Sequence, residues 1–558
     1  MISSFKLKFG RTPNSEGEEI QATPITIFVG PNNSGKSKLL DEIRQYCENG
    51  KNSDFVILDK INVTNIEPEI YLESAIQDLK ENSKTIGLDS NDINIVIKIT
   101  DNSYDYITKK KLAESLRNPQ NNIELFCRNF FKYQILFLNG ISRIALLGIQ
   151  EGGDLKNPPS SSFQVLLRNE QKLNDIRKII YEAFNLHLII DPTELGKLKA
   201  CLSSDPPINH LEKSIFHPDS IDFYKKSQNI DATSDGVKAF TGILTQIIAG
   251  DPRVLLVDEP EAFLHPALAY KLGNEISKIA NKENKRIFTS THSPNFLMGC
   301  IQAGTPINII RLTYRNNTAT ARLLPSTELL ELMRHPLLRS TGVLSGLFYE
   351  SIVITESDAD RAFYQEVNER LLRFKPEWGI PHCLFINAQN KQTIHTIIRP
   401  LRKLGIPAVG IFDIDALKEG GKVWSNLLEC GSTPPLLKNS LSTMRKSILD
   451  ALDATKKNMK RDGGINILPE LEKEAANTLL NQLAEYGLFI IPNGELEYWL
   501  KELAVTGHGP EWLINIFEKM GSDPESESYV KPTDKDVWEF MAKIRNWLLN
   551  PNRKGIPA

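Results

Sequence analysis

The sequence of 558 residues is long enough for two to four domains of roughly 150 residues each, and its composition, with 41% hydrophobic and 24% charged residues, is that of an ordinary globular protein. A formal net charge of -3 gives no overall attraction to nucleic acid, so contact with DNA or RNA requires a local basic surface. The sequence has no run of about 18 apolar residues, no basic-then-apolar N-terminal segment and no C-x-x-C pair among its six cysteines, so we expect a cytoplasmic protein without a membrane span, a zinc ribbon or a disulfide framework.

The first motif lies in residues 24–43, PITIFVGPNNSGKSKLLDEI. An apolar run ends at Gly30 and a helical pattern starts near Lys36, which places the glycines in a strand-to-helix turn. The spacing G-x-x-x-x-G-K-S is that of a P-loop, whose backbone N–H groups cradle the phosphates of ATP while its Lys reaches the β- and γ-phosphates and its Ser ligates Mg²⁺. The predicted nucleotide-binding residues of this motif are Gly30, Asn33, Gly35, Lys36 and Ser37.

Two later apolar runs carry the other groups that ATP hydrolysis needs. Residues 253–266, RVLLVDEPEAFLHP, read as a strand that ends in Asp258 and Glu259. We expect Asp258 to hold Mg²⁺ and Glu259 to orient or deprotonate the attacking water. A second strand, in residues 285–294, delivers His292 as a sensor of the γ-phosphate. A lone His is more often structural, but the order of the three motifs favours a nucleotide hydrolase.

The segment DATSDGVKAF, residues 231–240, lies just before the Asp-Glu strand. In this position the sequence resembles the signature loop of ABC-type ATPases, in the branch related to SMC proteins, and Ser234 and Gly236 match the Ser and Gly of that family. The flanking residues depart from its L-S-G-G-Q pattern. Ser234 as an ordinary helix N-cap is an equally good interpretation of the segment alone. The resemblance implies that Ser234 and Gly236 contact the nucleotide of a second subunit, in a head-to-tail homodimer of ATPase heads.

The ATPase domain is expected to span residues 1–345. Within it, the stretch from about 65 to 230 is predicted to include a largely helical insertion or dimerisation region, because residues 67–88 and 169–190 show helical spacing of apolar side chains.

After residue 345 the pattern changes to alternating strands and helices. Residues 351–367 read as a strand, Glu356 and a helix, and residues 382–417 continue as strand, helix and strand. This order implies a parallel sheet with its ligands at the carboxyl ends of the strands. The stretch GIFDIDAL, residues 410–417, places Asp413 and Asp415 on one face at such an end, where a cationic partner is needed. The three carboxylates can converge on Mg²⁺ or Mn²⁺, which prefer oxygen ligands.

A Glu on one strand and D-x-D on a later one resemble the Toprim domain of topoisomerases, primases and related nucleases. ITESDADRAFY resembles the E-G-x-x-D element of that domain, with Ser357 in place of the Gly and Asp360 as the second acid. The alternative is that the acids cap helices or face solvent, which we favour only for Asp358 as an N-cap. The resemblance implies catalysis by Glu356, Asp413 and Asp415, with metal ligands drawn from Glu356, Asp360, Asp413, Asp415 and, in LFIIPNGELEYWLKEL (488–503), Glu497.

Three choices in this domain stay open. Glu495 is an alternative to Glu497, although it is also an ordinary first-turn glutamate. Lys531, Lys535 and Lys543 are candidates for stabilising charge in the transition state. The segment at 444–464 carries six basic and three acidic residues, within a basic helical insertion expected near 430–485, and either lines a path for nucleic acid or is a solvated helix face.

An ABC-type P-loop ATPase head followed by a Rossmann-like Toprim sheet at 346–558 is the α/β arrangement of the OLD (overcoming lysogenization defect) family. That family includes the Gabija nuclease subunit and retron-associated antiphage effectors. The resemblance implies an ATP-binding and ATP-hydrolysing, metal-dependent DNA endonuclease that is homo-oligomeric through its heads and acts in antiphage defence, with a protein or retron-type RNA/DNA as regulator. The alternatives are a recombination- or repair-type DNA-binding ATPase with a non-cleaving Toprim domain, a topoisomerase or primase, and a scaffold that uses ATP only to dimerise.

Overall fold

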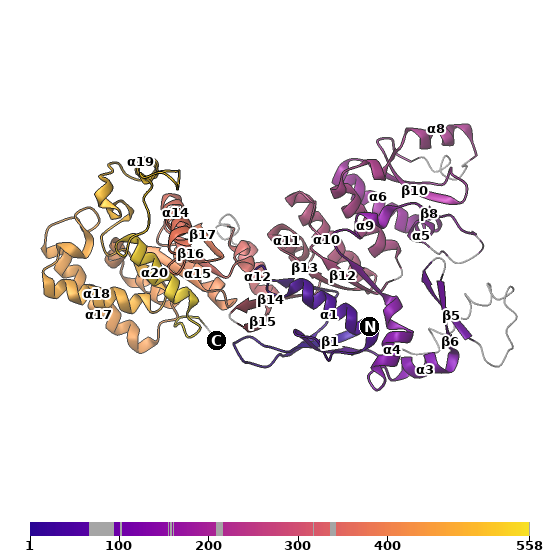
Figure 1. The fold of residues 1–558 in the computed structure, drawn as a ribbon, viewed down its shortest axis with the longest axis horizontal. Helices are drawn as coiled ribbons and strands as arrows, with labels where there is room; N and C mark the ends of the chain where they lie inside the picture. Colours follow the sequence, from indigo (N-terminus) through magenta and orange to yellow (C-terminus); the bar gives the residue numbers. More distant parts are fainter. Residues whose placement is uncertain are drawn as a thin grey trace. The chain divides into compact units, whose positions relative to one another are not determined.

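The computed structural model divides into two units, coloured from indigo at the N-terminus to yellow at the C-terminus in Figure 1. The N-terminal unit spans Met1–Val29 and Asn33–Leu330, and the C-terminal unit spans Glu331–Ala558, with Gly30–Asn32 grouped with it. The helix predicted for residues 67–88 lies outside the described residues. The structure describes residues 1–65, 94–100, 103–154, 156, 159, 161–207, 216–250, 252–315, 317–334 and 342–556.

A six-stranded sheet, in the order β15-β14-β3-β13-β12-β7, is the centre of the N-terminal unit. All neighbouring pairs are parallel except β14 and β15, which form an antiparallel hairpin. The strands β3, β12 and β13 therefore end at the same edge, where ligands of parallel sheets bind. The bounds are β3 (Ile25–Val29), β7 (Ile135–Leu138), β12 (Val254–Asp258), β13 (Arg286–Ser290), β14 (Ile307–Arg315) and β15 (Thr318–Leu324).

One face of this sheet packs against a second, antiparallel sheet, β2-β1-β4, and against α1. Phe5 of β1 meets the rings of Phe28 and Phe288 edge-on, with centroids 6.5 and 5.7 Å away. These rings exclude water from the strands that precede the candidate site. The bounds here are β1 (Ile2–Leu7), β2 (Glu19–Gln21), β4 (Leu58–Val63) and α1 (Lys36–Asn49), and the helices α9 (Asp235–Ala249), α10 (Pro266–Lys282), α11 (Pro294–Gln302) and α12 (Ser326–Arg334) follow later in the chain.

The segment between β4 and β12 adds helices and short strands, labelled in Figure 1. β7 lies within the stretch 65–230, where an insertion is expected, and is itself a strand of the main sheet. The additions therefore fall on either side of β7. They comprise β5 (Asn94–Thr100), β6 (Ser103–Thr108), α3 (Lys109–Arg117), α4 (Ile123–Asn129), β8 (Gln150–Glu151), α5 (Ser162–Arg168), α6 (Glu170–Phe184), β9 (His187–Asp191), β10 (Lys197–Ser203), α8 (Pro218–Lys226) and β11 (Gln228–Asn229).

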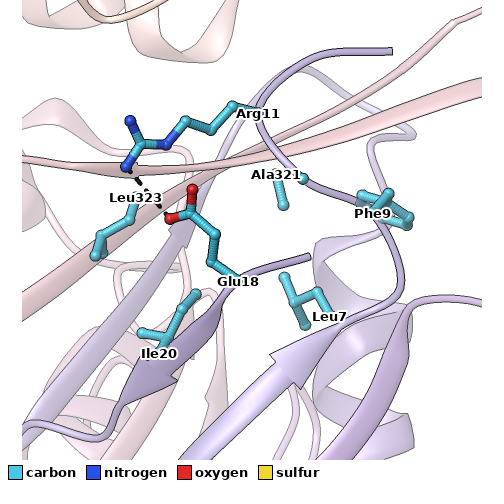
Figure 2. Close-up of a pocket in the computed structure, with 8 residues that line it drawn as sticks. Leu7, Phe9, Arg11, Glu18, Ile20, Ala321 and Leu323 are labelled. Carbon is cyan, nitrogen blue, oxygen red and sulfur yellow. Dashed lines mark hydrogen bonds and ion pairs between the residues drawn. The ribbon is translucent and has the colours of Figure 1, made fainter. Parts of the chain in front are cut away.

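Figure 2 shows a small pocket between the loop after β1, β2 and β15. Its lining is mostly aliphatic, and at its rim Arg11 and Glu18 form an ion pair with an N–O distance of 3.3 Å. The cavity volume of about 10 Å³ has room for roughly one water molecule, so the pocket is a packing feature rather than a ligand site.

The C-terminal unit is built on a parallel sheet in the order β17-β16-β18-β19. Val353, Val409 and Ile411 share a core with α14 and α20, whereas Gly410, which points to the opposite face, lies against Ile394 of α15. Helices therefore cover both faces. The bounds are β16 (Ser351–Thr355), β17 (Cys383–Asn387), β18 (Ala408–Phe412), β19 (Leu488–Ile490), α14 (Asp358–Phe374), α15 (Ile394–Lys403), α16 (Gly421–Cys430), α17 (Pro435–Ala454), α18 (Glu470–Ala484), α19 (Pro510–Met520) and α20 (Val537–Leu549).

The tryptophans lie in one unit, whereas the cysteines are divided between both. All six tryptophans lie in the C-terminal unit, and Trp512 and Trp538 are among its most buried side chains. The six cysteines are free thiols, and all except the partly buried Cys383 are buried. Among the described residues, no helix combines the length and the apolarity needed to cross a membrane.

Candidate nucleotide and metal sites

The turn between β3 and α1 has the backbone conformation of a phosphate-binding loop. Gly30, Asn33 and Gly35 have φ angles of 144°, 61° and 92°. The positive φ of Gly35 strains any other residue, and a Cβ atom there would also lie 2.6 Å from Cδ1 of Ile57, which would have to shift. The loop leads into the N-terminus of α1, a 14-residue helix whose free N–H groups and dipole favour an anion.

Lys36 and Ser37, the first two residues of α1, meet acidic groups from β12. Lys36 is only 5% exposed, and burial lowers the pKa of its ammonium group to about 8 although Glu259 and Asp258 oppose the shift. The Ser37 hydroxyl donates to Oδ1 of Asp258 over 3.0 Å. The two predicted Mg²⁺ ligands are therefore adjacent, and both offer the oxygen atoms that this cation prefers.

Glu259 and His292 come together because their strands are neighbours, with Asp258 of β12 paired to Ser290 of β13. Glu259 has a φ of 51°, and its N–H donates to the Ser290 carbonyl over 3.1 Å. Nε2 of His292 lies 3.6 Å from Oε1 of Glu259. Burial and then the nearby Lys36 charge lower the pKa of His292, which favours a neutral imidazole at pH 7. A neutral imidazole can orient a water or a phosphate oxygen by hydrogen bonding.

Two further residues of this site were not predicted. The carboxylate of Glu261 is buried, which raises its pKa, and it accepts hydrogen bonds from the Thr291 hydroxyl over 2.8 Å and from the N–H of His292 over 2.9 Å. The buried Arg143, in the loop after β7, donates to the carbonyl of Glu259. Glu261 lies within the segment 253–266 quoted above, two residues after Glu259, so its position next to the motif is a signal in the sequence. Nothing in the local sequence marks Arg143.

Ser234 and Gly236 lie at the start of α9. Ser234 occupies the N-cap position and is exposed, but its side chain accepts no hydrogen bond from the described first turn of the helix. A Cβ atom at Gly236 would lie 2.6 Å from the carbonyl oxygen of Phe263, in the loop after β12. Ordinary capping therefore does not use the Ser234 hydroxyl, which is left exposed at a helix N-terminus.

In the C-terminal unit, the predicted carboxylates Glu356, Asp413 and Asp415 converge. Glu356 follows β16 and Asp413 follows the adjacent β18, while Asp415 lies in the short helix η6 (Ile414–Lys418). One oxygen from each lies within 4.8 Å of the others, and Oε1 of Glu356 accepts from the N–H of Asp413 over 3.0 Å. Burial and then the proximity of Asp413 raise the pKa of Glu356 to about 8, and burial raises that of Asp413 to about 7.

These residues fit a divalent cation. Oδ1 of Asp415 is buried and has no hydrogen-bond partner among the described residues, and burial, with a smaller contribution from the neighbouring carboxylates, raises the pKa values of Glu356 and Asp413. A hard cation with oxygen ligands would supply both the missing charge and the missing partner.

Two lysines border this carboxylate cluster. Nζ of Lys460 lies 2.7 Å from Asp413 and 3.4 Å from Glu495. Nζ of Lys391 lies 2.9 Å from Asp415 and 3.2 Å from Glu419. Lys460 belongs to the basic segment 444–464, for which a nucleic-acid path or a solvated face is expected, and here it faces carboxylates. Of the lysines considered from the sequence, Lys543 pairs with Glu539 on α20 and Lys531 lies over the ring of Phe374.

The remaining acids lie around the cluster. Oε1 of Glu497 lies 2.6 Å from Nδ1 of His508, and these two residues and Glu495 form a second group whose ligand atoms lie within 4.8 Å of one another. Asp360 accepts from the N–H and the hydroxyl of Ser357 over 2.9 and 2.8 Å.

The prediction that Asp358 is the N-cap of α14 is wrong, because Ser357 holds that position in a capping box with Asp360. Asp358 instead pairs with Arg361 over 2.7 Å and accepts from Asn387 over 3.0 Å. The Ser that replaces the Toprim glycine therefore has a local role, since its hydroxyl and Asp360 satisfy the first N–H groups of the helix.

Comparison with known proteins gives related domains for both units. The family model AAA_21, an AAA domain, matches residues 25–298, and the model for the Toprim domain of proteins like the overcoming lysogenization defect protein matches residues 347–415. The ATP-binding protein LolD of a lipoprotein-releasing system, from Rickettsia bellii, is 23% identical over 171 residues, which cover 28% of this chain and 77% of LolD.

Among solved structures, an SMC head bound to the C-terminal winged-helix domain of ScpA is similar at 14% identity, covering 59% of this chain and 99% of the SMC head, with a TM-score of 0.35. The SMC head domain from Thermotoga maritima is similar at 12% identity, covering 58% and 99%, with a TM-score of 0.29. The assignment rests on the two family models rather than on these structures. The two family models confirm the predicted α/β architecture of a P-loop ATPase domain followed by a Toprim parallel sheet. The chain therefore belongs to the OLD family, in which an ATPase domain is fused to a Toprim domain.

Proposed function

We propose that this protein is an ATP-hydrolysing, divalent-metal-dependent DNA endonuclease that acts in defence against phage. The observation that carries the proposal is the convergence of Glu356, Asp413 and Asp415 within 4.8 Å at the carboxyl ends of neighbouring parallel strands. An ATPase domain with an intact P-loop in the same chain supports the coupling of this site to ATP. The defence role rests on family membership alone.

In the ATPase domain, each residue has a role that follows from its position. Lys36 and the N-terminus of α1 would bind the phosphates, and Ser37 and Asp258 would hold Mg²⁺. Glu259, with the neutral His292 beside it, orients or deprotonates the attacking water. The exposed Ser234 hydroxyl, which local capping does not use, is available to the nucleotide of a second chain. We therefore propose that ATP bound between two such chains favours a homodimer.

In the Toprim domain, Glu356, Asp413 and Asp415 would hold Mg²⁺ or Mn²⁺ through carboxylate oxygens, with Glu497 and Asp360 as further ligands nearby. A cation held there would supply Lewis-acid chemistry, which lowers the pKa of a bound water and offsets charge on the leaving oxygen in phosphodiester cleavage. The protein fixes the carboxylates on the ends of rigid strands, and burial keeps bulk water from competing for them. Asp360 accepts both hydrogen bonds from Ser357 at Oδ2, so its Oδ1 is the oxygen that would ligate a cation while the capping box stays closed.

The test is cleavage of supercoiled and linear DNA by the purified chain with Mg²⁺ or Mn²⁺, with and without ATP. Asp413→Ala should lose cleavage while keeping ATP hydrolysis. Lys36→Met should lose ATP hydrolysis, and any effect of this variant on cleavage should be indirect. The two variants serve as controls for each other, because each disables one site only. If the wild type binds DNA but cuts none in any condition, the chain is better explained as a DNA-binding ATPase with a non-cleaving Toprim domain.

The defence role has its own test. Cells that carry the intact gene should show a lower plating efficiency of some phages than cells that carry the Asp413→Ala variant at equal expression. Protein and nucleic acid that copurify with the chain would reveal a regulatory partner. Equal plating with both forms over a broad phage panel would contradict the defence role and leave the enzymatic proposal standing.

A further inference from the structure

Lys460 places an ammonium group against three carboxylates of the C-terminal unit. Its Nζ lies 2.7 Å from Oδ2 of Asp413, 3.4 Å from Oε2 of Glu495 and 3.9 Å from Oδ2 of Asp415. The side chains of these acids are only 15%, 7% and 20% exposed. Two of the three are the same acids that would ligate a divalent cation. Lys391 is placed differently, because it pairs with Asp415 and with Glu419, outside the cluster.

The backbone around Lys460 is closely packed. A Cβ atom on Gly494, which has a φ of 121°, would lie 2.2 Å from the Lys460 carbonyl oxygen, so the two loops touch through their main chains. The N–H of Ile465 donates to the Pro492 carbonyl over 2.9 Å, and Gly494 in turn accepts from the N–H of Ile414, next to Asp413. The loop that carries Lys460 is therefore attached to the same turn that adjoins the cluster.

We infer that the Lys460 ammonium competes with the divalent cation for Asp413, so that cation binding requires Lys460 to withdraw from this carboxylate. The inference rests on the proposed metal-dependent function. Mg²⁺ would sit about 2.1 Å from a ligating oxygen. With the ammonium nitrogen 2.7 Å from the same carboxylate, the two cations would repel each other strongly in a site that is largely shielded from water. Lys460 thus sets the affinity of the site for the cation.

The experiment is a titration of the full-length chain with Mn²⁺, followed by isothermal calorimetry and by the electron paramagnetic resonance signal of free Mn²⁺. The test variant is Lys460→Met, which keeps the length of the side chain and removes its charge. The matched control is Lys457→Met, because Lys457 is an exposed lysine of the same loop and its loss changes the net charge equally. Glu356→Gln removes one ligand of the carboxylate cluster. The part of the heat of Mn²⁺ binding that is lost in this variant therefore comes from the cluster.

The expected result is that Lys460→Met binds Mn²⁺ at least about tenfold more tightly than the wild type, while Lys457→Met stays within about twofold of it. Near-ultraviolet circular dichroism of the tryptophans verifies that each variant is folded. Equal or weaker binding by Lys460→Met, still abolished by Glu356→Gln, would overturn the inference and leave the metal site in place. Absence of Mn²⁺ binding in both the wild type and Lys460→Met would overturn the metal-dependent function itself, and the inference with it.

Discussion

Replacing Asp413 with Asn should stabilise the C-terminal unit at pH 8 in the absence of divalent cations while it abolishes DNA cleavage. Burial raises the pKa of Asp413 from 3.8 to about 7, with Lys460 opposing the shift. Above that pKa, the folded chain holds an ionised carboxylate in a place that disfavours it, and the unfolded chain does not. The difference between the two pKa values corresponds to roughly 4 kcal/mol at about 1.4 kcal/mol per pKa unit, and Asn removes this penalty because it cannot ionise.

A unit of this size gains about 2–4 °C in unfolding temperature per kcal/mol, so we expect an increase of about 8–16 °C. Tryptophan fluorescence is a suitable assay because all six tryptophans lie in this unit. The gain should shrink as the pH falls from 7 toward 3.8, and it disappears only below that pH, where Asp413 is protonated in both the folded and the unfolded chain. Asp453→Asn, at an exposed position of α17, is the matched control. An unchanged or lower unfolding temperature for Asp413→Asn at pH 8 would refute the reasoning.

Four further predictions concern both sites. Glu259→Gln should keep ATP binding but lower the rate of phosphate release at least about a hundredfold, and a smaller loss would assign the water-activating role to another residue. Gly35→Ala should abolish ATP binding in a filter assay, because its φ is 92° and the new methyl group would meet Ile57, and normal binding would show that the loop can adjust. Affinity for Mn²⁺ should rise with pH up to about 8, since burial and then Asp413 raise the pKa of Glu356 to about 8 and the cation needs its ionised form. The unfolding free energy without cation should fall over pH 4.5 to 8, because the folded chain there holds more protons than the unfolded one, and flat profiles would contradict both statements.

Motifs that are local in sequence could be predicted because local spacing decides their geometry. The glycines of the P-loop are required by positive φ angles in one short turn. Asp413 and Glu356 could be placed together because both follow strands of one parallel sheet, and the carboxyl ends of such strands share an edge. No alignment or three-dimensional information is needed for either conclusion.

Residues that reach a site from a distant segment could not be predicted. Lys460 meets Asp413 only because its loop packs against the turn at Gly494, and Arg143 reaches Glu259 from the loop after β7, over a hundred positions away in the chain. Both contacts depend on how loops pack, which the periodicity of apolar residues does not encode. The N-cap of α14 could not be decided from the sequence, because Ser357 and Asp358 stand next to each other and both residue types are favoured at that position.

The buried cysteines make this chain well suited to site-specific labelling. Burial raises the pKa of the Cys127, Cys300 and Cys430 thiols to about 12, so almost none of each is thiolate at pH 7. Because the thiolate is the reacting form, a maleimide dye should leave these native thiols largely unmodified. A single cysteine introduced at the exposed Lys225 of α8, outside the candidate nucleotide site, would then carry a fluorophore, and energy transfer between two labelled chains would report when one ATPase domain approaches another.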